Sequence, residues 1–71
     1  MKRYRNSNGD SGVAAYEVGE DYILVKFSKG GTYSYSYRKA GERHVDEMKR
    51  LAQRGSGLNT YINKNVKNLY D

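Results

Sequence analysis

The sequence contains no cysteine and only one histidine among its 71 residues. The absence of cysteine excludes disulfides and thiolate metal sites. A single histidine also excludes a histidine-based zinc site, unless carboxylates or a second chain supply the other ligands. We therefore predict no metal and no cofactor. A chain without cysteine also fits a reducing compartment.

Long hydrophobic segments are missing as well. No apolar run approaches the roughly 18 residues that a transmembrane helix requires, so we expect no membrane association. The basic start, Met1 to Arg5, is not followed by a hydrophobic stretch, which argues against a secretory signal peptide. The simplest expectation is a cytoplasmic protein.

Size and charge limit the protein further. A chain of 71 residues is long enough for one domain with a thin core, and it buries only about 60% of its unfolded surface. The net charge is +5, from thirteen basic and eight acidic residues. Residues 38–71 carry eight basic residues but only four acidic ones, so positive charge is concentrated in the C-terminal half. This bias favours polyanionic partners, or it serves solubility alone.

Alternation of apolar and polar residues predicts three β-strands. The predicted strands cover Val13–Val18, Tyr22–Phe27 and Thr32–Tyr37, with turns at 19–21 and 28–31. On the central strand Ile23, Val25 and Phe27 share a face, because strand side chains alternate. We expect this face to point into the core.

The periodicity changes to that of helices in the second half of the chain. An amphipathic helix is predicted from about Lys39 to Arg54, and Gly41 can delay its start by a residue or two. Gly55 suits a left-handed cap at its end. A second helix is predicted from about Leu58 to Leu69. Its expected inner face consists of Leu58, Tyr61, Ile62, Val66, Leu69 and Tyr70.

Together these elements predict an α+β fold of order β-β-β-α-α. A three-stranded antiparallel meander with two helices packed on one face is the economical two-layer arrangement. The folded domain is expected to span residues 13–71. Residues 1–12 are polar and rich in Asn, Ser and Gly, so we expect a flexible N-terminal tail there, or else a segment that Tyr4 attaches to the domain.

The sequence also carries an ordered set of motifs around a central Tyr33-Ser34-Tyr35. The other positions of the set are Ile23, Val25, Phe27, Gly30, Met48, Leu51-Ala52, Gly55, Gly57-Leu58-Asn59, Tyr61-Ile62 and Tyr70. Together they resemble the KTSC domain, a small domain with a central Y-x-Y motif. It occurs at the C-terminus of some lysyl-tRNA synthetases and as a stand-alone bacterial protein. The resemblance covers about residues 13–70. The family has no established activity, and RNA binding has been suggested for it from the attachment to a synthetase.

One departure from that family lies directly after the central motif. Family members often have a proline there, whereas this chain continues with Tyr37-Arg38-Lys39. The departure concerns the connection between the third strand and the first helix.

The tyrosines of the third predicted strand pose the main functional question. Tyr33, Tyr35 and Tyr37 share one face because they occupy alternate positions. They are either the wall of a small core or a stacking platform beside a basic patch. We expect Tyr35 in the core, with Tyr37 or Tyr22 as the more exposed ring.

Basic residues lie on both sides of this tyrosine strand, residues 32–37, in the sequence, and further basic residues follow in the predicted helices. Aromatic rings interleaved with cations are typical of surfaces that bind single strands. The candidate nucleic-acid-binding residues are Tyr33, Tyr37, Lys29, Arg38, Lys39, Arg54, Lys64 and Lys67. The glycine-rich turn at residues 55–57 is either a tight turn or a place for one phosphate at the start of the next helix.

Catalysis is not expected, because no nucleophile and no defined pocket accompany His44. The leading prediction is a small non-enzymatic module that binds RNA or single-stranded nucleic acid. One alternative is a protein-interaction module whose sheet face or edge strand receives a peptide. Another is a self-associating domain that gains buried area by forming a homodimer.

Overall fold

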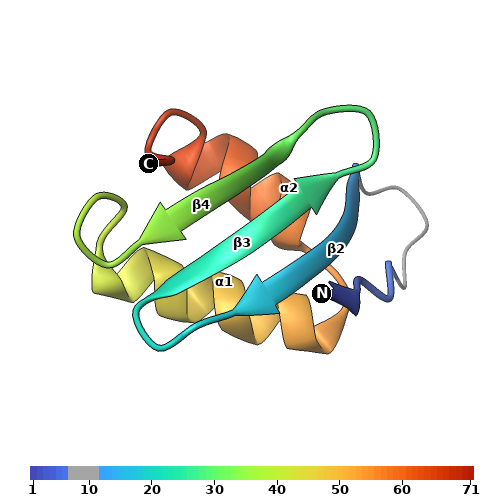
Figure 1. The fold of residues 1–71 in the computed structure, drawn as a ribbon, viewed down its shortest axis with the longest axis horizontal. Helices are drawn as coiled ribbons and strands as arrows, with labels where there is room; N and C mark the ends of the chain where they lie inside the picture. Colours follow the sequence, from blue (N-terminus) through green and yellow to red (C-terminus); the bar gives the residue numbers. More distant parts are fainter. Residues whose placement is uncertain (7–11) are drawn as a thin grey trace.

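A four-stranded antiparallel sheet packs against helices in the computed structural model, which describes residues 1–6 and 12–71 (Figure 1). The strands, in sheet order, are β1 (Lys2–Arg3), β2 (Val13–Val18), β3 (Tyr22–Phe27) and β4 (Thr32–Ser36). The helices are α1 (Glu42–Arg54) and α2 (Leu58–Tyr61), and α2 continues directly as the π-helix η1 (Ile62–Val66). The predicted α+β class is confirmed, but the sheet has four strands where three were expected.

The meander of β2, β3 and β4 follows the predicted pattern closely. β2 and β3 have the predicted bounds, and β4 ends one residue early, at Ser36. There the chain turns, because the Ser36 carbonyl accepts hydrogen bonds from the N–H groups of Lys39 and Ala40 at 3.2 and 2.9 Å. Cross-strand partners lie on the same face of a sheet, and Tyr35 is paired with Ile23. The tyrosine face of β4 is therefore the inner face.

The additional strand comes from the segment that was expected to be a flexible tail. Lys2 and Arg3 pair with β2, and the Tyr4 N–H donates to the Ala14 carbonyl at 3.0 Å. The Tyr4 side chain is only 3% exposed, and its hydroxyl accepts a hydrogen bond from the Leu58 N–H at 3.2 Å. Tyr4 thus attaches the N-terminus to the domain, as the alternative interpretation had it. The rest of the expected tail, residues 7–11, lies outside the described residues.

Glycines set the bounds of α1. The helix begins at Glu42 instead of Lys39, because Gly41 has a φ of +103° and cannot belong to a right-handed helix. At the other end, Gly55 has a φ of +87° and its N–H donates to the Leu51 carbonyl at 2.9 Å. This left-handed cap confirms the prediction for Gly55.

The second helix is shorter and less regular than predicted. It changes from an α-helix to a π-helix at Ile62 and ends at Val66, not at Leu69. Leu58, Ile62 and Val66 are buried, as expected for its inner face, whereas Tyr70 is exposed.

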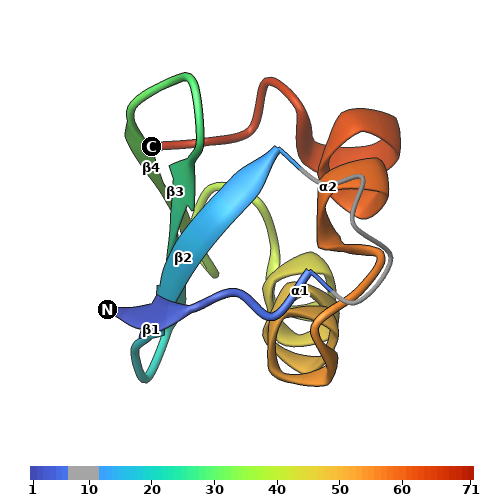
Figure 2. The ribbon, with the colours of Figure 1, turned by 90° about the vertical axis from the view of Figure 1, so that its right-hand side faces the viewer.

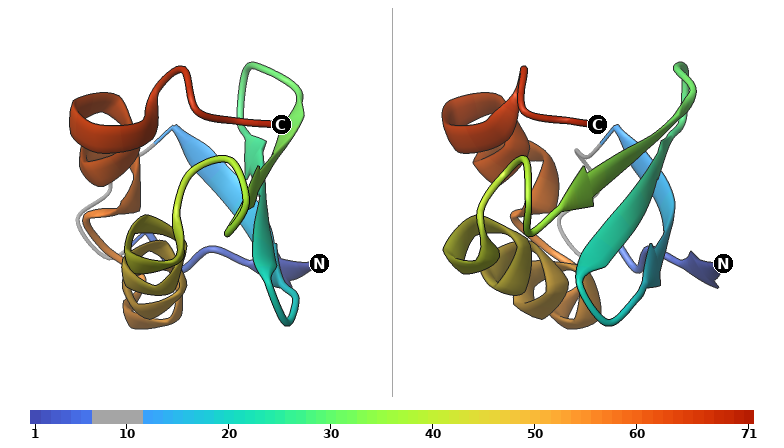
Figure 3. Two further views of the ribbon diagram at one scale, coloured as in Figure 1. Left: turned by 90° about the vertical axis from the view of Figure 1, so that its left-hand side faces the viewer. Right: turned by 60° about the vertical axis from the view of Figure 1, so that its left-hand side comes forward.

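The described helices all lie on one face of the sheet (Figures 2 and 3). The core lies between this face and the helices. Ile23 and Val25 are fully buried there, as predicted, and Phe27 is half-buried at the end of its strand. The opposite sheet face is covered by no described helix (Figure 2). No helix in the described part of the chain is both long and apolar enough to span a bilayer.

Candidate functional site

Tyr33, Tyr35 and Tyr37, which alternate along the third predicted strand, have three different environments. Tyr35 is 2% exposed, and its burial raises the pKa of its hydroxyl to about 12. Tyr33 lies at the rim of the same face and is 36% exposed. Tyr37 and Tyr22 are half-buried, so each is more exposed than Tyr35, as expected, but Tyr33 is more exposed than either. The inner face is therefore a core wall at Tyr35 and an accessible aromatic surface at Tyr33.

Tyr37 is engaged by helix α1. Its hydroxyl donates a hydrogen bond to Asp46 Oδ1 at 2.5 Å, and this bond raises its pKa to about 12, with a smaller contribution from burial. Lys49 Nζ lies 4.9 Å from the centre of the Tyr37 ring and donates to the hydroxyl at 3.4 Å. Because these contacts occupy its hydroxyl and one ring face, Tyr37 is poorly placed to stack on a ligand.

Tyr33 instead belongs to a groove between the sheet and the C-terminal segment, which we call the aromatic groove. Its volume is about 240 Å³. The residues that line it are Phe27, Tyr33, Tyr35, Ile62, Asn63, Lys67, Asn68 and Tyr70. The Tyr33 ring makes edge-to-face contacts with Phe27 at 5.7 Å and with Tyr70 at 4.8 Å between ring centres. Tyr70 is 41% exposed, so two tyrosine rings at this rim remain accessible.

The C-terminal residue holds Tyr70 in place. After η1 the chain crosses from the helical layer to β4 (Figure 3), where the Asp71 N–H donates to the Ser34 carbonyl at 2.8 Å. The Asp71 carboxylate accepts hydrogen bonds from the hydroxyls of Ser34 at 3.0 Å and Ser36 at 2.7 Å. These serines alternate with the tyrosines of β4, so the carboxylate is bound on the side of the strand away from the groove.

The charge of the aromatic groove is positive. Lys67 is charged, and none of the described residues that line the groove is acidic. Lys64 follows the lining residue Asn63 in η1, and Lys29 lies in the turn between Phe27 and β4. Two of the predicted site residues, Tyr33 and Lys67, therefore line the groove. Lys29 and Lys64 do not line it, but each lies within two residues of a lining residue in the sequence.

The remaining predicted site residues lie elsewhere. Arg38 and Lys39 follow the far end of β4, in the turn that leads to α1. Arg54 ends α1, which is about 20 Å long at 1.5 Å per residue, and its Nε donates to Ser56 Oγ at 3.1 Å. The structure thus does not gather all eight predicted residues on one surface. In the turn at residues 55–57, the Leu58 N–H that a phosphate would use is already bonded to Tyr4.

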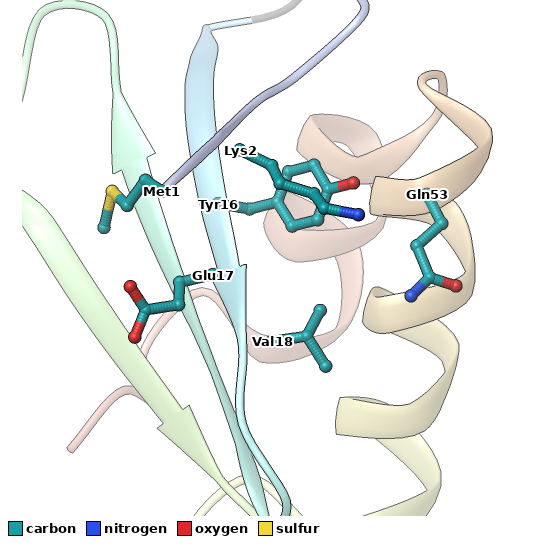
Figure 4. A pocket seen from close by; sticks show the side chains of 6 residues that line it. All are labelled: Met1, Lys2, Tyr16, Glu17, Val18 and Gln53. Atoms are coloured by element: carbon teal, nitrogen blue, oxygen red, sulfur yellow. The ribbon is translucent and has the colours of Figure 1, made fainter.

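A second hollow lies between β1, β2 and the last turns of α1 (Figure 4). Its volume is about 480 Å³, and its lining residues are Met1, Lys2, Tyr16, Glu17, Val18 and Gln53. Tyr16 and Val18 point toward α1, whereas Glu17 points away from it (Figure 4). This hollow is less suited to a polyanion, because it offers one aromatic ring and includes a carboxylate.

Sequence reasoning missed Phe27, Asn63, Asn68 and Tyr70 as groove residues. Phe27 and Tyr70 were assigned to inner faces. Tyr70 contacts Tyr33 because the second helix ends early, at Val66.

Comparison with known proteins found no matching family model, no similar curated protein and no similar solved structure.

Proposed function

We propose that this protein is a small non-enzymatic module that binds single-stranded nucleic acid in the aromatic groove. The observation that carries the proposal is the combination of two accessible tyrosine rings, Tyr33 and Tyr70, with Lys67 in a groove whose described lining has no acidic residue. Exposed rings beside cations are what single-strand binding requires, because bases stack on the rings while lysines neutralise phosphates.

The size of the groove limits the expected affinity. Stacking on an aromatic side chain contributes about 1–3 kcal/mol per base, and the groove offers two accessible rings. We therefore expect weak, salt-dependent binding of short strands, with Lys67, Lys64 and Lys29 near the phosphates. Arg38, Lys39 and Arg54 are assigned to the general positive field that attracts the polyanion, because they lie outside the groove.

The resemblance to the KTSC domain supports the same proposal. Its motif positions include five of the groove residues, Phe27, Tyr33, Tyr35, Ile62 and Tyr70. We propose on this basis that the chain is a KTSC-like domain of the cytoplasm, and that RNA is the nucleic acid it binds.

Fluorescence anisotropy with short labelled single-stranded RNA, over a range of salt concentrations, tests the proposal. Lys67→Gln should weaken binding and reduce the steepness of the plot of log K against log salt by about 0.7, the contribution of one phosphate contact on a single strand. Lys26→Gln is the matched control, because Lys26 is exposed on the uncovered face of β3. An equal loss in both variants would contradict a site in the groove.

Tyr70→Ala tests the stacking component with the same assay. The ring is exposed, so its removal should reduce affinity while the melting temperature changes little.

A competition assay on the wild-type protein separates nucleic acid from acidic peptides, with poly-glutamate added as the competitor at equal charge concentration. If poly-glutamate displaces RNA completely, the groove recognises acidic peptides and the nucleic-acid proposal is wrong.

A second candidate function is peptide binding at the edge of β4. The observation that supports it is the hydrogen bond from the Asp71 N–H to the Ser34 carbonyl, a backbone contact made at this edge. Self-association through the uncovered sheet face is the other alternative, and sedimentation of the protein over a range of concentrations separates it from both.

A further inference from the structure

We propose that the aromatic groove recognises an adenine base, and that Asn63 and Asn68 read the edge of that base. This inference rests on the proposed function and adds the identity of the preferred base. Two side-chain amides in the groove make no hydrogen bond within the described part of the domain.

Asn63 and Asn68 both line the groove, and neither side-chain amide has a hydrogen-bond partner among the residues that the structure describes. Asn65, between them in sequence, donates from its amide to the Tyr61 carbonyl at 3.2 Å and does not line the groove. The two groove amides are therefore available to a ligand, whereas the amide between them is used within the helix.

The irregular helix explains why these two residues share the groove. In a π-helix the hydrogen bonds join residues five positions apart, and such turns are frequent at functional sites. Asn63 lies in the first turn of η1, and Asn68 follows five residues later, just beyond its end. Ile62 supplies an apolar surface beside them.

An asparagine amide carries one acceptor and two donors, so a single side chain can contact a base at two points. The best-matched base is adenine, whose N7 accepts from the amide and whose N6 amino group donates to it. In this arrangement the base stacks on Tyr33 or Tyr70, its edge faces the amides, and Lys67 lies near the adjoining phosphate. The groove therefore offers an aromatic ring to the face of the base, an amide to its edge and a cation to the phosphate.

The test compares oligonucleotides that differ by one amino group. A short RNA with a single adenine in a uridine background is measured beside the same RNA with purine in place of adenine. Purine stacks in the same way but lacks the N6 donor. Because purine keeps N7, the comparison removes one of the two hydrogen bonds, and we expect adenine to bind about 2- to 12-fold more tightly. Equal affinities for the two RNAs would overturn the inference while leaving the proposed function intact.

The variants connect the preference to the amides. In a protein with both Asn63→Ala and Asn68→Ala, the adenine preference should disappear, while binding of the purine RNA remains. Asn65→Ala is the matched control and should retain the preference. A preference that survives the double substitution would overturn the role of the amides. Failure of the wild-type protein to bind any of these RNAs would overturn the proposed function, and this inference with it.

Discussion

At the scale of single residues, Tyr35 decides how the tyrosine strand is interpreted. Its side chain is almost completely buried beside Ile23 and Val25 on the inner face. We predict that Tyr35→Ala costs on the order of 3–5 kcal/mol of unfolding free energy, as other large aromatic truncations do. Tyr35→Phe keeps the ring and should cost far less. Urea denaturation of both variants measures the difference, and a stable Tyr35→Ala protein would show that the core has been misassigned.

The tyrosine hydroxyls also predict how stability depends on pH. The pKa values of Tyr35 and Tyr37 are about 12 in the folded protein, compared with an ordinary value of 10.0. A folded pKa above the unfolded one stabilises the protein fully below pH 10.0, and this contribution is lost as the pH rises through about 12. We predict falling urea midpoints across that interval.

The control for this prediction is a protein with both Tyr35→Phe and Tyr37→Phe. Because it lacks the two hydroxyls, its urea midpoint should fall much less steeply over the same pH interval. An alkaline loss of the same size in this variant would assign the effect to other groups.

At the scale of elements, the predictions succeeded where a pattern extends over several residues. The alternation in β3 fixes both its bounds and its inner face. In β2 it fixes the bounds alone, because a bulge between Val13 and Ala15 breaks the alternation and both Val13 and Tyr16 are buried. β1 has only two residues, which is too short to show alternation, and it depends on the contact of Tyr4 with Leu58. The π-helix could not be predicted either, because the spacing of Leu58, Ile62 and Val66 also fits an ordinary α-helix.

Gly31, directly before β4, and Gly41, directly before α1, allow a controlled test of backbone strain. An added Cβ would meet no atom within 4 Å at Gly41 or at Gly31, but only Gly41 has a positive φ, of +103°. Gly41→Ala should therefore cost about 1–3 kcal/mol, through backbone conformation alone. Gly31→Ala should be nearly neutral. Thermal or urea denaturation measures the loss of unfolding free energy in each variant. Equal losses would contradict the claim that a side chain at position 41 strains the backbone before α1.

At the scale of the whole molecule, the site depends on a contact between distant parts of the chain. Ser34 and Asp71 are 37 residues apart in sequence, and their hydrogen bond brings Tyr70 to Tyr33. Composition and local patterns predicted Tyr33 and Lys67 as site residues. They could not predict the groove, because its second wall exists only once the C-terminal segment has crossed to β4.

The central claim is that single-stranded nucleic acid binds in the aromatic groove, and an NMR titration tests it most directly. Backbone amide signals of the wild-type protein are followed as short single-stranded RNA is added at low and then moderate salt. We predict that the largest shifts occur at Tyr33, Asn63, Lys67 and Tyr70, and that they diminish with salt. Shifts concentrated on the uncovered face, at Leu24 and its neighbours, or the absence of any shift, would contradict the account.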